Sequence, residues 1–120
     1  MMKKILRTYK TFDIVIVPFP FVDSAKTKNR PAIVISCEKT FNKNSDHTIL
    51  AMITSSKHSP WPLDVEIKNL NKCGLEKKSI IRLKFFTLDN RLIKNKIGHL
   101  NPEDKKKLKK NIKLAFNQVI

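Results

Sequence analysis

The sequence is poor in glycine and cysteine, and these shortages exclude several classes of protein. Its 120 residues include only two glycines and two cysteines, with no glycine-rich phosphate loop and no CxxC pair. Dinucleotide-binding folds, P-loop enzymes, disulfide scaffolds and cysteine zinc sites therefore have no support. The three histidines are isolated, and neither an HExxH nor a GxSxG pattern occurs. We therefore expect no bound metal and no cofactor.

Long apolar runs are also missing. The longest uncharged apolar stretch, IVIVPFPFV at 14–22, is too short to cross a bilayer. The first twelve residues, MMKKILRTYKTF, carry charges but lack the apolar centre of a signal peptide. We therefore expect a cytoplasmic protein that does not act at a membrane. The length, with 41% hydrophobic and 29% charged residues, predicts one globular domain over residues 1–120.

Positive charge is present in excess. Twenty-five lysines and arginines face ten acidic residues, so the formal net charge is +15. Self-repulsion of this size does not help a fold, but it favours a polyanionic partner. Nucleic acid, an acidic protein and an anionic surface all fit this charge. A generally lysine-rich composition without a functional meaning is the alternative.

Short β-branched and aromatic runs predict a sheet. The spacing of ten to fifteen residues between runs favours a small, strongly bent antiparallel sheet or barrel over βαβ units. Segment 91–100 is ambiguous between a strand and a short helix. Polar segments at 22–29 and 38–47 are expected to be loops. The predicted strands are 13–19, 31–36, 48–56, 63–67 and 79–88.

A helix is predicted at the C-terminal end. Asn101 can cap it, Pro102 suits its first position, and two acidic residues follow in the first turn. Apolar residues then recur at helical spacing, which predicts that one face of the helix packs on the sheet. This stripe consists of Leu108, Ile112, Ala115, Phe116 and Val119. The fold class is therefore mainly β with a C-terminal helix, an α+β arrangement.

Polar side chains gather at the predicted strand ends. Proline cannot donate a ladder hydrogen bond, so Pro31 belongs at a strand's first residue or on an edge. Arg30 is then held at a strand entrance, either as a surface ion pair or directed at a phosphate. Thr54 and Ser55 end the third strand, where hydroxyl groups either make a turn or contact a ligand.

Five ordered pieces of the sequence resemble the MazF/PemK toxins of type II toxin–antitoxin systems. The similarity runs from about Asp13 to Leu100 and covers most of the chain. Arginine–proline before an apolar strand, with ITS at the end of the next strand, is moderately specific, and the ordered set is more so. The pieces are DIVIVPFPFVD, KNRPAIVIS, MITSS, CGLEKKS and FTLDNRLI with IGHL.

The resemblance implies an SH3-like barrel, usually homodimeric, that cleaves single-stranded RNA without metal. The ribose 2′-OH attacks the adjacent phosphate and leaves a 2′,3′-cyclic phosphate and a 5′-OH. Arg30 matches the family arginine, and Thr54 matches the threonine or serine of the third strand, so both are predicted to be catalytic. The predicted RNA contacts are Asp23, Lys26, Lys28, Ser55, Lys57, Arg82 and Lys84.

The fifth strand departs from the family pattern. Many members have Gln-x-Arg-Thr-x-Asp, whereas here Lys84 replaces the glutamine and Phe86 the arginine. A one-residue shift of the strand decides whether Arg82 takes the part of the missing arginine. For Arg82 and Lys84, a solvated strand face is the alternative to an RNA contact. Trp61 either belongs to a proline–aromatic loop cluster or stacks on a base.

The expected partners are single-stranded RNA, a separate acidic antitoxin that blocks the groove, and a second copy of the chain. Operator DNA is a further expected partner together with the antitoxin. A CcdB-like toxin that binds DNA gyrase and a non-catalytic DNA-binding autorepressor are the alternative functions. The pairing of Arg30 with Thr54 favours RNA cleavage, because a gyrase-binding protein has no need of it.

Overall fold

Six antiparallel strands form a curled sheet in the computed structural model, which describes residues 7–19, 28–55, 57 and 59–120. The strand order is β4-β5-β3-β2-β1-β6. The strands are β1 (Asp13–Phe19), β2 (Lys28–Val34), β3 (His47–Ser55), β4 (Val65–Glu66), β5 (Ser79–Asp89) and β6 (Asn95–His99). The helical segments are η1 (Glu38–Asn42), α1 (Lys43–Ser45), η2 (Asn90–Leu92) and α2 (Pro102–Ala115).

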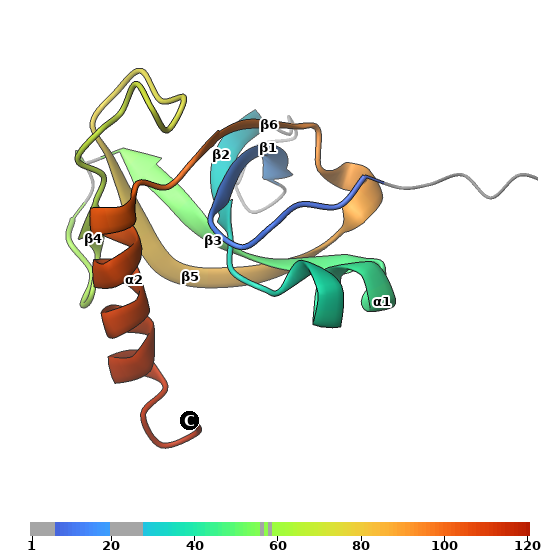
Figure 1. Ribbon diagram of the computed structural model, residues 1–120. Coiled ribbons are helices and arrows are strands. Elements are labelled where there is room, and N and C mark those ends of the chain that lie inside the picture. The colour runs from blue at the N-terminus through green and yellow to red at the C-terminus, as the bar shows by residue number, and fades with distance from the viewer. Residues whose placement is uncertain (1–6, 20–27, 56, 58) are drawn as a thin grey trace, which may run out of the picture.

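The sheet bends strongly and buries side chains on both of its faces. Register shifts between Ile14 and Val15 in β1, and between Ala51 and Met52 in β3, introduce irregularities that increase local twist. One buried cluster contains residues such as Ile14 and Ile33, and the other contains Val15 and Ala32. Because neighbours along a strand point to opposite faces, the two clusters occupy the two faces of the curled sheet shown in Figure 1.

The predicted small, strongly bent antiparallel sheet with a C-terminal helix is confirmed. The ambiguous segment 91–100 contains the end of the 3₁₀ turn η2, followed by strand β6. The prediction of a loop over 38–47 was wrong for most of its length, because η1 and α1 occupy 38–45. The buried Asn42 side chain stabilises this helical segment by donating to the carbonyls of Tyr9 and Ser36.

Helix α2 begins as predicted but is less covered than its apolar stripe suggested. The Asn101 side chain accepts from the backbone N–H of Asp104, 2.9 Å away. Leu108 is fully buried, whereas Val119 is 83% exposed and lies beyond the helix. Figure 1 shows why: α2 starts beside β4 and then extends away from the sheet. No helix in the described part of the chain could span a membrane.

The two glycines allow the segment before β5 to pack directly on β6. Gly74 has a φ of +75°, and a Cβ there would lie 2.0 Å from the carbonyl oxygen of Ile97. A Cβ on Gly98 would lie 2.2 Å from the carbonyl oxygen of Cys73. Such a close approach of two backbones requires glycine on each side. This contact fixes residues 74–79 over the sheet, where they line the candidate site.

Candidate functional site

Strands β2 and β3 pair over only part of their lengths. Their register runs from Val34 opposite Leu50 to Ala32 opposite Met52. The residue before Ala32 is Pro31, which has no backbone N–H to extend the β2–β3 hydrogen-bond ladder. Arg30 therefore lies beyond the part of β2 that pairs with β3, although it still pairs with Val17 of β1. The predicted position at a strand entrance was wrong, because β2 begins at Lys28 and Arg30 lies within it.

A pocket of about 380 Å³ occupies this end of the sheet. Both residues predicted to be catalytic, Arg30 and Thr54, contribute to it, and so does Ser55. The remaining lining residues come from β1, β2, β3, β6 and the segment that leads into β5. They are Ile16, Pro31, Ile53, Gly74, Leu75, Glu76, Lys77, Lys78, Ser79 and Ile97.

Arg30 contributes a buried donor that no described residue satisfies. Its Nε atom is buried and has no hydrogen-bond partner among the residues that the structure describes. Leaving a buried polar group unpaired costs roughly 1–3 kcal/mol, so native proteins pair most such groups. The surface ion pair considered for Arg30 is not seen within the described chain. A planar guanidinium in this state suits an oxyanion with two accessible oxygens.

The hydroxyl groups at the end of β3 have different surroundings. Thr54 is only 4% exposed, and it shares a face of β3 with Met52 and Leu50, because residues two apart on a strand point the same way. Ser55 is half-buried, and its Oγ accepts a hydrogen bond from the backbone N–H of Lys57 at 3.3 Å. Ser55 thus makes the strand-end turn that was one of the two readings for these hydroxyls.

Arg82 has several protein partners. Its Nε and one terminal nitrogen donate to the two carboxylate oxygens of Asp64, at 3.2 and 3.0 Å. The same terminal nitrogen donates to the carbonyl oxygen of Ser59 at 2.7 Å. The guanidinium carbon also lies 5.1 Å from the ring centre of Trp61. Arg82 does not line the Arg30 pocket, and its donors hold segment 59–64 on β5.

The three lysines among the predicted RNA contacts that the structure describes do not line the pocket. Lys28 in β2, Lys57 after β3 and Lys84 in β5 are all exposed. Asp23 and Lys26 lie outside the described residues. Sequence reasoning missed the contribution of Lys77 and Lys78 to the pocket lining. A signal was present, because these two lysines follow the first of only two glycines in the chain.

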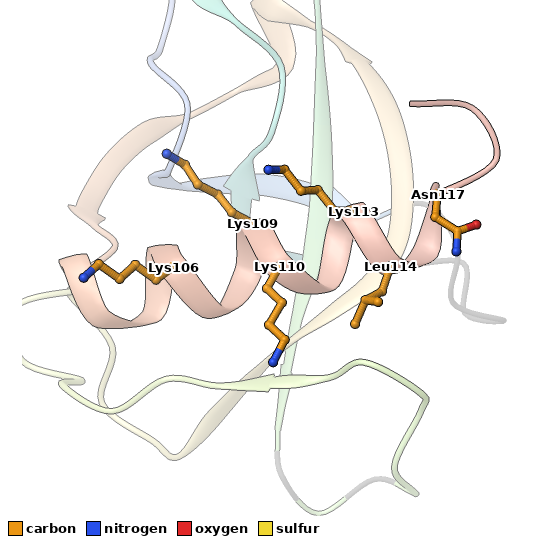
Figure 2. Close-up of a pocket in the computed structure, with 6 residues that line it drawn as sticks. All are labelled: Lys106, Lys109, Lys110, Lys113, Leu114 and Asn117. Atoms are coloured by element: carbon orange, nitrogen blue, oxygen red, sulfur yellow. The ribbon is translucent and has the colours of Figure 1, made fainter.

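A second basic surface lies on α2 and shares no residue with the Arg30 pocket. The shallow pocket on this surface has a volume of about 530 Å³. Figure 2 shows Lys109 and Lys113 extending to one side of the helix, with Lys110 and Leu114 on the other. The lining residues are Lys106, Lys109, Lys110, Lys113, Leu114 and Asn117.

The buried carboxylate of Asp13, the first residue of β1, links this strand to β6. Asp13 is 3% exposed, accepts from the Lys10 backbone, and contacts His99 and Lys96 at 2.8 and 3.2 Å. Burial alone raises the pKa of this carboxyl, but the hydrogen bonds from His99, Lys10 and Lys96 together lower it below its ordinary value. No cluster of three or more His, Cys, Asp and Glu suited to a metal ion occurs among the described residues.

The amino-acid sequence matches the model of a known protein family. Residues 10–116 match the model of the PemK-like, MazF-like toxins of type II toxin–antitoxin systems. Among curated protein sequences, none matches this chain.

Several solved structures share the fold at low sequence identity. A mycobacterial endoribonuclease, solved with its cognate antitoxin, has a TM-score of 0.72 and 11% identity, covering 92% of this chain and 96% of its own. MazF from Deinococcus radiodurans has a TM-score of 0.70 and 14% identity, covering 92% and 98%. The Mycobacterium tuberculosis toxin MazF-mt6 has a TM-score of 0.66 and 18% identity, covering 88% and 96%.

The family match extends over the whole sheet and all of α2, and it includes both Arg30 and Thr54. The chain therefore belongs to the PemK-like, MazF-like toxins of type II toxin–antitoxin systems.

Proposed function

We propose that this toxin is an endoribonuclease that cleaves single-stranded RNA without a metal ion, with Arg30 and Thr54 as its catalytic residues. The observation that carries the proposal is the buried, unpaired Nε of Arg30 in the pocket that Thr54 also lines. Endoribonuclease is the description given to the mycobacterial relative. The net charge of +15 favours a polyanionic substrate.

The reaction needs charge stabilisation more than a strong nucleophile. The ribose 2′-oxygen bonds to the adjacent phosphorus, and the bond from phosphorus to the 5′-oxygen breaks. The 2′-OH proton passes to a base, and the departing 5′-oxygen gains a proton, leaving 2′,3′-cyclic phosphate and 5′-OH ends. Arg30 would bind two phosphate oxygens and stabilise the extra charge of the pentavalent transition state. The Thr54 hydroxyl would donate to a phosphate oxygen or orient the 2′-OH.

The test is an assay of cleavage and of the chemistry of the RNA ends. Purified protein is incubated in EDTA with a long unstructured RNA, and the fragment ends are analysed. We expect cuts that end in 2′,3′-cyclic phosphate and that disappear in Arg30→Ala. Arg91→Ala is the matched control, because Arg91 is exposed and pairs with Asp89 away from the pocket. Intact RNA with folded wild-type protein would refute the proposal and favour a gyrase-binding or DNA-binding toxin.

We also propose an acidic antitoxin as the physiological inhibitor and a homodimer as the active form. Two structurally similar proteins, one mycobacterial and one from Deinococcus radiodurans, are described in complex with an antitoxin. The basic surface of α2 lies beside exposed apolar residues, a combination that suits an acidic segment with apolar anchors. These apolar residues are Leu114, Phe116, Val119 and Ile120.

Charge reversal tests the role of this surface in antitoxin binding. Replacing Lys106 and Lys110 by glutamate should weaken capture of the cognate antitoxin while cleavage by the free toxin persists. Replacing Lys39 and Lys43, which are exposed on η1 and α1, by glutamate changes the net charge equally and is the control. Equal antitoxin binding by both double variants would contradict this location. Sedimentation of the free toxin as a monomer at assay concentration would contradict the dimer.

A further inference from the structure

Trp61 is a half-exposed aromatic ring held on a charged support. The Arg82 guanidinium lies 5.1 Å from the ring centre, and Arg82 itself is only 7% exposed. Trp61 is 45% exposed. The buried arginine therefore leaves nearly half of the Trp61 surface accessible to solvent. This arrangement leaves an aromatic surface open to a ligand.

The same carboxylate fixes both members of the stack. Asp64 pairs with Arg82 and also accepts a hydrogen bond from the backbone N–H of Trp61 at 2.9 Å. The Asp64 and Arg82 side chains are 12% and 8% exposed, so this ion pair is shielded from solvent. The ring is therefore ordered before any ligand arrives, which lowers the entropy cost of binding.

The strand register places this stack close to Thr54. Thr54 lies opposite Ile80, and Met52 lies opposite Arg82. Opposed residues share a sheet face, and residues two apart on one strand do so as well. Arg82 therefore starts from the same face of the sheet as Thr54, about 7 Å further along the strand. That spacing is comparable to the distance between neighbouring nucleotides in an extended single strand.

We propose that Trp61 is a base-stacking residue that binds a nucleotide flanking the cleaved phosphate. The inference rests on the proposed ribonuclease function and adds a substrate contact outside the Arg30 pocket. Stacking on an aromatic ring accepts any base, so Trp61 contributes binding and strand direction more than base choice. The guanidinium behind the ring adds a positive charge that favours a nucleic acid over a neutral apolar ligand.

The protein's composition provides a direct probe. Trp61 is the only tryptophan in the chain, so intrinsic tryptophan fluorescence reports this ring alone. The ligand is a mixed-sequence 2′-O-methyl RNA, which lacks the attacking hydroxyl and stays intact. Its binding is followed separately through the anisotropy of a terminal dye. An abasic sugar–phosphate oligomer of equal length is the ligand control, because it carries the same charges but no bases.

We expect the RNA to quench Trp61 fluorescence with the same midpoint as the anisotropy change, and the abasic oligomer to bind without quenching. In anisotropy, Trp61→Ala should weaken RNA binding about five- to a hundredfold, whereas Trp61→Phe should retain most of it. Leu92→Ala is the protein control, because Leu92 is exposed to a similar degree, 49%, outside this stack. In cleavage, Trp61→Ala should raise KM and leave kcat nearly unchanged.

Two outcomes would overturn the inference in distinguishable ways. RNA binding by anisotropy with unchanged Trp61 fluorescence, or equal affinity of Trp61→Ala and wild type, would exclude stacking and leave the ribonuclease proposal standing. No anisotropy change with any oligonucleotide, by folded wild-type protein, would remove RNA binding altogether and the stacking contact with it.

Discussion

Arg30 and Arg82 start from the same face of one sheet, but their surroundings are opposite. Arg82 has both carboxylate oxygens of Asp64, a backbone carbonyl and an aromatic ring around it. Arg30 has a buried Nε with no partner in the described part of the chain, and it borders a pocket. Arg82 therefore stabilises the fold, whereas Arg30 is the arginine that we propose binds the substrate.

The difference lies in what the neighbouring segment supplies. A chain reversal after β3 brings Asp64 back over β5, so the charge of Arg82 is neutralised inside the protein. Near Arg30, the β2–β3 ladder stops at Ala32, and the described lining of the pocket includes two further lysines. Glu76 also lines the pocket, so its described lining has three basic residues and one acidic residue and is net positive. A site of this charge attracts anions, and a phosphodiester is the anion most suited to the planar fork of arginine.

The largest expected effect comes from removing the partner of Arg82. Asp64→Ala leaves a buried guanidinium uncompensated and should lower the free energy of unfolding by roughly 3–5 kcal/mol. Urea denaturation measures it. Glu66→Ala is the matched control, because the Glu66–Lys68 pair is long at 3.9 Å and about half exposed. That variant should lose no more than about 1 kcal/mol. Equal losses would show that the Arg82 pair has no special structural weight.

The next effect is on rate rather than on stability. Thr54→Val removes the hydroxyl and keeps the branched shape, so RNA cleavage should slow about a hundredfold, or roughly 2.7 kcal/mol of transition-state stabilisation. Ser55→Ala is the control, because the Ser55 hydroxyl accepts a turn hydrogen bond from Lys57. Single-turnover cleavage measures both variants. A Ser55→Ala protein slower than Thr54→Val would exchange the roles assigned to the two hydroxyls.

The third expected effect is a pH dependence of stability that arises from Asp13. Because the pKa of Asp13 is lowered in the fold, its ionised form contributes stability above about pH 4, the ordinary range of a carboxyl. That contribution is lost as the pH falls from about 4 through the folded pKa. Wild type should therefore lose more unfolding free energy between pH 6 and pH 3 than Asp13→Asn does, and the variant should be weaker by about 1–2 kcal/mol at pH 6.

Wild type must be compared with Asp13→Asn, because Asp89 contributes to the loss of stability at low pH in both proteins. Its pKa is lowered to about 2 by the Arg91 side chain at the surface. Urea midpoints at pH 6 and pH 3 for the two proteins isolate the share of Asp13. Parallel losses in wild type and variant would contradict a stabilising role for its ionised form.

The smallest effects are expected from the exposed lysines. Lys57 and Lys84 are each predicted to contact a phosphate, so each alanine variant should reduce the slope of log K against log salt by about 0.7. Lys43→Ala, on α1, should leave the slope unchanged. Binding of a 2′-O-methyl RNA at three salt concentrations measures this. A slope that falls equally in all three variants would indicate a general charge effect in place of specific contacts.

Local sequence signals were sufficient for part of this picture. The apolar run after Pro31 correctly predicted a strand, although β2 begins three residues earlier, at Lys28, and the asparagine–proline pair predicted the start of α2. The partner of Arg82 could not be predicted in the same way. Asp64 precedes Arg82 by 18 residues, and the pairing depends on how segment 59–64 folds back over β5. Long-range closure of this kind leaves no periodic pattern in the sequence.

Helix α2 also shows how little a local sequence pattern says about long-range packing. Its helical period correctly identified Leu108 as a core residue, but the period carries no information on how far the sheet extends beneath the helix. Phe116 packs against the ring of Phe85 but is still 38% exposed, and Val119 lies beyond the end of the helix. The missing coverage is a property of the whole fold and was outside the reach of a local pattern.

We propose that Arg30 binds the substrate, whereas Arg82 stabilises the fold. The most direct test measures RNA cleavage and urea unfolding on the same preparations of Arg30→Gln and Arg82→Gln. We expect Arg30→Gln to cleave RNA at least a hundredfold more slowly than wild type, with an unfolding free energy within about 0.5 kcal/mol of it. Arg82→Gln should instead lose several kcal/mol of stability. An Arg30→Gln protein that cleaves at the wild-type rate, or that loses as much stability as Arg82→Gln, would contradict the account.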